Sequence, residues 1–151
     1  MNHIAIIPAR SGSKRLPGKN TKSFLGTPMI ARAILTAKST NIFDRIIIST
    51  DDPDTAGLAI EYGAEAPFIR DAALSGDNVA TVPVIKDAIL KTKTDENLPE
   101  FVTAIYPCTP LLQPEDLIHA FETLKISQAS YVFPISEFPS PPERSLSLGA
   151  F

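Results

Sequence analysis

The segment from residue 9 to residue 20 has the side chains and the spacing of a phosphate-binding loop. It reads ARSGSKRLPGKN and follows an apolar run directly. Its glycines let backbone N–H groups approach a phosphate closely, and its Arg and Lys side chains offer a planar fork and point charges for phosphate oxygens. We therefore predict that Arg10, Lys14 and Lys19 bind phosphate. A basic surface loop without function is the alternative.

Two familiar phosphate loops do not fit this segment. Gly12 and Gly18 are one residue too far apart for a Walker A loop, and Asn20 stands where that loop has Ser or Thr. No G-x-G-x-x-G occurs, so a P-loop kinase and a dinucleotide-binding Rossmann domain are weak alternatives.

The charge is distributed unevenly along the chain. Residues 1–43 hold seven Lys and Arg and no acid, whereas the rest holds seven bases and all seventeen acids. Such a local excess of positive charge favours a small polyanion as ligand. Nucleic acid is not expected as a partner, because it requires a broader basic surface and a higher isoelectric point than 5.3.

Length and composition indicate one soluble globular domain of 151 residues, with 44% apolar and 21% charged residues. No stretch has the roughly 20 apolar residues of a membrane span, so no membrane partner is expected. The single Cys108 permits no internal disulfide, and the first residues lack a basic signal region. These features predict a cytoplasmic protein.

Alternating apolar and polar segments predict the elements that position the loop. Strands are predicted at residues 4–8, 46–48, 66–69, 101–106 and 131–135, and helices at 28–35, 53–62, 81–92 and 115–126. Gly63 is the expected C-cap of the second helix. This alternation predicts an α/β fold with a mostly parallel sheet. The proline-rich residues 136–151 are expected to form a loosely ordered tail. We also expect the chain to end before the fold is complete.

Polar residues after the other strands are further candidates, because ligands bind at the carboxyl ends of parallel strands. Asp51 and Asp52 suit magnesium, but the cap of the helix that begins at Pro53 is the favoured role of Asp52. Cys108 and His119 lack a catalytic partner motif, and we expect both to be structural.

The sequence from Ile7 to Asn20 resembles the signature loop of the cytidylyltransferases that activate nonulosonic, sialic-type acids. The segments 43–52, 62–65, 67–70 and 74–77 follow in that family's order and spacing, so the resemblance covers nearly the whole chain. Segments 66–70, 105–107 and 131–135 are most similar to the pseudaminic acid branch. Enzymes of the sialic acid branch usually have Gln where Tyr106 stands.

The resemblance implies a three-layer α/β/α, Rossmann-like nucleotide-diphospho-sugar transferase fold. It also implies transfer of CMP from CTP to a nonulosonic acid, with pyrophosphate released, Mg²⁺ as cofactor and a homodimer. The family's metal-binding acids lie nearer the C-terminus, where this chain has no matching segment, so the metal ligands stay unassigned. A cytidylyltransferase for another acid sugar and a truncated, noncatalytic CTP-binding module are the alternatives.

The resemblance also assigns residues. Arg10, Lys14 and Lys19 are the implied catalytic cations, and Tyr106 and Thr109 face the sugar acid. The implied nucleotide-binding residues are Ala9, Arg10, Ser11, Gly12, Ser13, Lys14, Lys19, Asn20, Arg70 and Thr81.

Three of these assignments have open alternatives. Arg70 could instead form an ion pair with Asp71 or Asp77. Thr81 could be the N-cap of its helix, and the serines could bond to their own backbone.

Overall fold

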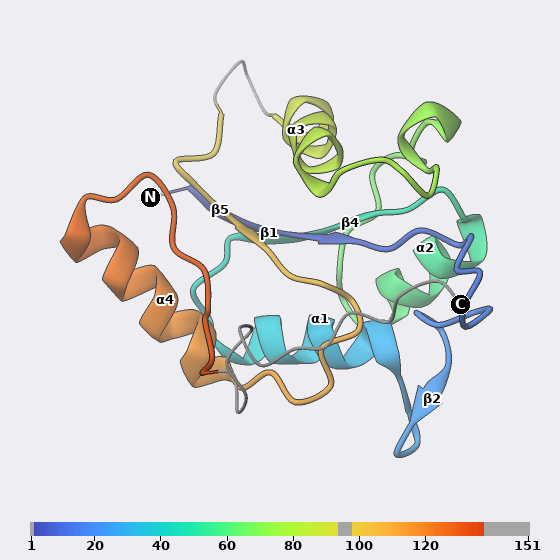
Figure 1. Cartoon of the computed structure of the whole chain (residues 1–151), viewed down its shortest axis with the longest axis horizontal. Helices are drawn as coiled ribbons and strands as arrows, with labels where there is room; N and C mark the ends of the chain where they lie inside the picture. Colours follow the sequence, from blue (N-terminus) through green and yellow to red (C-terminus); the bar gives the residue numbers. More distant parts are fainter. Residues whose placement is uncertain (1, 94–97, 138–151) are drawn as a thin grey trace, which may run out of the picture. The chain divides into compact units, whose positions relative to one another are not determined.

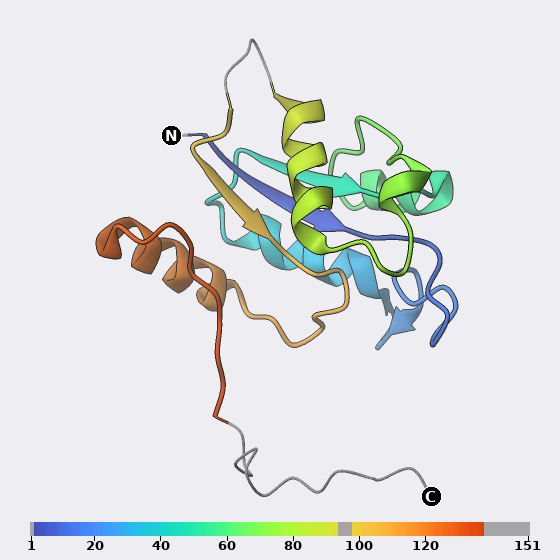
Figure 2. The same ribbon diagram turned by 45° about the horizontal axis from the view of Figure 1, so that its top comes forward.

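A computed structural model describes residues 2–93 and 98–137 (Figures 1 and 2). The chain divides into two units, Met1–Ile118 and His119–Phe151. The first unit contains a parallel sheet with the strand order β4-β1-β5. These strands are β1 (His3–Pro8), β4 (Arg45–Ser49) and β5 (Phe101–Ala104). Ile6 of β1 lies opposite Ile47 on one side and Ala104 on the other. The predicted parallel sheet is therefore confirmed.

Helices cover both faces of this sheet (Figure 1). Helices α1 (Met29–Ser39) and α2 (Pro53–Glu61) pack on the face that carries Ala5 and Ile7. Helix α3 (Thr81–Thr92) packs on the face that carries Ile4 and Ile6. Neighbouring residues of a strand point to opposite faces, so the all-apolar run of β1 fills both layers of the core. The first unit thus has the predicted α/β/α layers.

A short hairpin lies between α1 and the segment of residues 9–20, which we call the cationic loop. The sequence did not predict this hairpin. Its strands are β2 (Ser23–Phe24) and β3 (Thr27–Pro28). Leu25 and Gly26 between them have φ values of +50° and +82°, the signs that a type I′ turn requires. Arg32 of α1 donates hydrogen bonds to the Phe24 carbonyl at 2.9 and 2.7 Å. These bonds tie the end of the cationic loop to the core.

Asp52 caps helix α2, as the sequence predicted. Its carboxylate accepts hydrogen bonds from Thr55 N at 2.9 Å and from Thr55 Oγ1 at 2.5 Å. Both bonds favour the charged carboxylate and lower the pKa of Asp52 below its usual 3.8. At the other end of the helix, Gly63 has φ +88°, the left-handed conformation expected there.

Asp52→Ala is expected to lower the free energy of unfolding by about 1 kcal/mol at neutral pH, because α2 loses its cap. A lowered pKa in the folded state means that the contribution is present above the ordinary pKa and is lost as the pH falls through the lowered value. Urea denaturation at a series of pH values measures the difference between variant and wild type. A difference that grew in acid would contradict this role.

Two predicted strands are wrong. Residues 66–69 form no continuous strand; only Glu65 and Ile69 make isolated bridges, to Ile47 and Thr50. Pro67 lies between them and has no N–H to donate, so the pairing is interrupted. Residues 131–135 are also without strand structure, and Tyr131 and Ile135 are exposed. An extended run needs a hydrogen-bonding neighbour, and residues 119–137 contain no strand.

The remaining elements are the 3-10 turn Ala72–Leu74 and α4 (Pro114–Ser127), whose Leu117 joins the core of the first unit. Over the described ranges, no helix has the length and apolar content needed to cross a bilayer. The predicted proline-rich tail, residues 136–151, lies outside the described residues except for Ser136 and Glu137.

Candidate functional site

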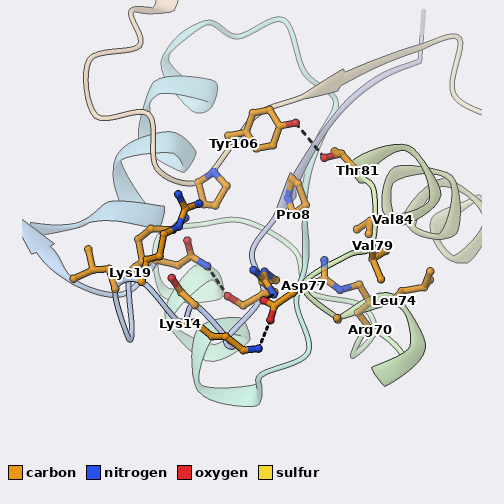
Figure 3. A pocket seen from close by; sticks show the side chains of 17 residues that line it. Pro8, Lys14, Lys19, Arg70, Leu74, Asp77, Val79, Thr81, Val84 and Tyr106 are labelled. Carbon is orange, nitrogen blue, oxygen red and sulfur yellow. Dashed lines mark hydrogen bonds and ion pairs between the residues drawn. The ribbon is translucent and has the colours of Figure 1, made fainter. Parts of the chain in front are cut away.

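A pocket of about 580 Å³ lies where the segments after β1 and β5 meet the segment that leads into α3 (Figure 3). This volume is in the range of small-molecule sites. Its walls combine cations, an amide, hydroxyls and apolar side chains, all from the first unit. They are Pro8, Arg10, Ser13, Lys14, Arg15, Leu16, Lys19, Asn20, Arg70, Leu74, Gly76, Asp77, Val79, Thr81, Val84, Tyr106 and Pro107.

Asp77 holds two of the predicted phosphate-binding cations. Arg10 Nη1 lies 2.5 Å from its Oδ1, and Lys14 Nζ lies 2.6 Å from its Oδ2 (Figure 3). Hydrogen bonds from Lys14 and Arg10 lower the pKa of Asp77. The carboxylate therefore lies between two cations that the sequence predicts to bind phosphate, so an anion that bound both cations would compete with Asp77.

Asn20 supports the loop from inside. It is buried, and its Nδ2 donates to the Arg10 carbonyl at 2.8 Å. Its Oδ1 accepts from the Cys108 thiol at 3.3 Å. Burial raises the pKa of Cys108, which opposes a thiolate nucleophile and agrees with the expected structural role. Asn20 thus fixes the Arg10 backbone while its side chain lines the pocket.

Arg70 is a buried cation at the pocket wall, only 4% exposed. Its Nη1 donates to the Ser49 carbonyl at 3.1 Å, and its Nε donates to Ser75 Oγ at 3.2 Å. Asp51 is its ionic partner, with Nη2 3.8 Å from Oδ1. Burial lowers the pKa of the guanidinium, and the Asp51 carboxylate opposes that shift.

The alternative partners of Arg70 are wrong. Asp71 accepts a hydrogen bond from Ala73 N at the start of the 3-10 turn, and Asp77 binds Arg10 and Lys14.

Two hydroxyls meet across the pocket. Thr81 Oγ1 and the Tyr106 hydroxyl are 3.1 Å apart, and both side chains line the pocket (Figure 3). Thr81 is the first residue of α3 and Ala80 is its cap, so the alternative in which Thr81 caps the helix is wrong. The bond connects Thr81, a predicted nucleotide-binding residue, to Tyr106, a predicted sugar-binding residue.

Four predicted site residues do not line the pocket. Ala9 is fully buried, and Ser11 hydrogen bonds to Asp51 through both its N–H and its hydroxyl. Gly12 lies in the loop without reaching the pocket. Thr109 Oγ1 donates to the Tyr106 carbonyl at 2.9 Å. Ser13, Lys14, Lys19 and Asn20 do line it, together with Arg10, Arg70, Thr81 and Tyr106.

Asp77 lines the pocket, and the sequence did not predict it as a site residue. Its signal was indirect: the loop of residues 9–20 has four cations and no acid, so it requires counter-charge from elsewhere, and Asp77 is the acid four residues before α3. The sequence predicted that the cations bind phosphate, but it did not predict which side chain of the protein they contact.

The acids at the end of β4 do not fit a magnesium site. Asp52 is committed to Thr55, and Asp51 is committed to Ser11 and Arg70. Residues 2–93 and 98–137 contain no group of three or more His, Cys, Asp or Glu that could hold a metal ion.

Asp77→Asn is expected to tighten the binding of inorganic tripolyphosphate by about tenfold, because Arg10 and Lys14 lose a competing anion. The gain should shrink as salt is added, since the interaction is electrostatic. Isothermal titration at two salt concentrations measures it, with the exposed Asp54→Asn as a control of equal charge change. Weaker binding by Asp77→Asn would show that Asp77 assists the anion rather than competing with it.

A parallel α/β/α fold with a pocket at the strand ends defines an α/β protein of the doubly wound class, in which ligands bind outside the carboxyl ends of the strands. The chain belongs to the cytidylyltransferase family, whose sequence profile, described as "Cytidylyltransferase", matches residues 4–138. This match includes every residue of the pocket.

Curated relatives are similar over nearly the whole chain. It is 38% identical to the pseudaminic acid cytidylyltransferase of Campylobacter jejuni over 148 residues, which is 98% of this chain and 64% of that protein. It is 37% identical to the CMP-N,N'-diacetyllegionaminic acid synthase of Legionella pneumophila, over 93% of this chain and 61% of that one. The chain therefore spans less than two thirds of these relatives.

A solved structure supports the fold. The chain superposes on CMP:2-keto-3-deoxy-manno-octonic acid synthetase, complexed with CTP, with a TM-score of 0.72. That likeness covers 85% of this chain and 49% of the other, at 22% sequence identity. The predicted nucleotide-diphospho-sugar transferase fold agrees with this neighbour.

Proposed function

We propose that this chain carries the CTP-binding part of a cytidylyltransferase, in which CMP is transferred from CTP to a nonulosonic acid and pyrophosphate is released. The observation that carries the proposal is the pocket itself. Arg10, Lys14 and Lys19 line one side, and the buried Arg70 lines another. The loop cations suit the negative charge of a triphosphate, and the buried guanidinium of Arg70 suits a polar base, to which it can donate hydrogen bonds.

Transfer of CMP to a sugar hydroxyl depends mainly on fixed positive charges, and the pocket supplies these. A hydroxyl of the acid sugar attacks the α-phosphorus, the bond to the bridging oxygen breaks, and pyrophosphate leaves with the electron pair. Negative charge spreads over non-bridging and leaving oxygens, which fixed cations stabilise. Lys19 and Arg10 are suitably placed for this role because they line the same pocket.

Pseudaminic acid is the favoured acceptor. The support is the 38% identity to the Campylobacter jejuni enzyme and the presence of Tyr106 at the predicted sugar side of the pocket. The legionaminic acid relative, at 37% identity, makes that sugar the second candidate. We also propose that the protein uses Mg²⁺ as cofactor, so the assays contain magnesium. We further propose that it is a homodimer in the cytoplasm, and light scattering tests the dimer by measuring the mass of the particle in solution.

Pyrophosphate release tests this proposal. The protein is incubated with CTP, magnesium and one of pseudaminic, legionaminic, N-acetylneuraminic or 3-deoxy-octulosonic acid. We expect release with CTP and fastest turnover with pseudaminic acid. Faster turnover with another sugar would overturn the acceptor. CTP binding without release from any sugar would favour the noncatalytic CTP-binding module.

A further inference from the structure

Asp51 contacts two segments that form the pocket wall: the cationic loop, through Ser11, and the buried Arg70. Its Oδ1 accepts a hydrogen bond from Ser11 N at 2.8 Å, and its Oδ2 accepts one from Ser11 Oγ at 3.0 Å. The same Oδ1 lies 3.8 Å from Arg70 Nη2. Asp51 itself does not line the pocket. One carboxylate therefore joins the start of the cationic loop to the buried guanidinium.

The contacts to Ser11 fix the cationic loop. Arg10 precedes Ser11, and Ala9 N donates to the Ser49 carbonyl at 2.9 Å, so the chain leaves β1 along β4 before it turns. The two bonds from Ser11 to Asp51 set the direction of that turn. Arg10 stands directly before this turn and Lys14 stands three residues after Ser11, so the direction of the turn decides where the two charges lie relative to each other.

The contact to Arg70 balances a buried charge. A buried guanidinium is costly without a counter-charge, and Asp51 is the carboxylate paired with it. Asp87 also faces Arg70 with the opposite charge, and Arg10 faces it with the same charge. Without Asp51, Arg70 would keep its hydrogen bonds to the Ser49 carbonyl and Ser75 Oγ but lose its ionic partner, so we expect the Nη2 end of its guanidinium to shift.

Helix α2 does not require these contacts. Asp52 already caps its N-terminus through Thr55, and Asp54 supplies a further negative charge in the first turn. The bonds of Asp51 instead reach the loop after β1, forty residues away in the sequence.

We infer that Asp51 is a positioning residue that orients the phosphate loop and Arg70 together, so that one carboxylate determines both triphosphate binding and the choice of base. The inference deepens the proposed function and rests on it for the identity of the ligand. Asp51 does not line the pocket, so it acts through Ser11 and Arg70.

The first test uses the protein without ligand and compares Asp51→Asn with Asp54→Asn. Both variants remove one negative charge near the start of α2, but Asp54 is exposed. Hydrogen exchange at the Ser11 amide is expected to become about tenfold faster in Asp51→Asn, as one charge-assisted hydrogen bond is lost. The NMR signal of Arg70 Nε–H should also move, and Asp54→Asn should change neither. An unchanged amide and an unchanged signal in Asp51→Asn would overturn the inference.

The second test measures two binding properties by isothermal titration: the affinity for inorganic tripolyphosphate and the ratio of CTP to UTP affinity. Asp51→Asn is expected to lower each by about tenfold. Lys19→Ala should lower only the first. A loss of one property alone in Asp51→Asn would contradict the joint role, and additive losses in Ser11→Ala combined with Asp51→Asn would contradict action through Ser11. If wild type binds no CTP, the proposed function fails, while hydrogen exchange still decides the role of Asp51.

Discussion

Lys19→Ala is expected to lower the rate of pyrophosphate release by about 100- to 1000-fold and to leave the melting temperature unchanged. The magnitude is that of losing one fixed charge aimed at the developing negative charge of a transition state. Lys19 lines the pocket, and none of the ion pairs among residues 2–93 and 98–137 involves it. Its charge is therefore free for a ligand, whereas Arg10 and Lys14 are held by Asp77.

The matched control is Lys22→Ala, because Lys22 is an exposed lysine of the same basic segment outside the pocket. It should keep full turnover. Steady-state kinetics with CTP and the preferred sugar compare the two variants, and differential scanning fluorimetry compares their folding. Wild-type turnover in Lys19→Ala would remove Lys19 from the mechanism.

Arg70→Met is expected to have the second large effect, on folding and on base selectivity together. Removing one partner of a buried ion pair leaves the other uncompensated, so the free energy of unfolding should fall by about 3 kcal/mol. In this variant the Ser49 carbonyl loses a hydrogen-bond donor and Asp51 loses its ionic partner. The preference for CTP over UTP should disappear, because Arg70 is the buried guanidinium of the pocket.

Arg70→Lys separates the two effects. Lysine keeps the charge but not the planar fork, so most of the stability should return while the selectivity does not. Chemical denaturation and titrations with CTP and UTP measure both quantities. Full selectivity in Arg70→Met would show that other residues read the base.

Local sequence patterns predicted the regular part of the fold. The β-branched runs of β1 and β4 are too apolar for an exposed strand, and Pro53 after Asp52 marks the start of α2 correctly. The β2-β3 hairpin could not be predicted, because its strands have two residues each and its turn is Leu-Gly rather than the Asn-Gly that is typical of two-residue hairpin turns. Strand 131–135 was predicted from alternation alone, which cannot show whether a neighbouring strand exists.

The chemistry of the site was predictable where it depended on residue type. A loop with cations and glycines predicts anion binding from local sequence. Six of its polar residues do line the pocket, namely Arg10, Ser13, Lys14, Arg15, Lys19 and Asn20. The directions of Ser11 and Thr109 were not predictable, because each hydroxyl bonds to the partner that the fold brings near it. The Asp77 pairs join segments more than sixty residues apart, which no local pattern reports.

Selective binding of CTP is the central claim, and a thermal-shift titration tests it most directly. The protein is melted with magnesium and increasing CTP, in parallel with UTP, GTP and ATP. A ligand at about 100 times its Kd adds roughly 2.7 kcal/mol to the free energy of unfolding, so a clear rise in Tm with CTP alone is the predicted result. Equal shifts with all four nucleotides, or no shift with any of them on a cooperatively melting sample, would contradict the account.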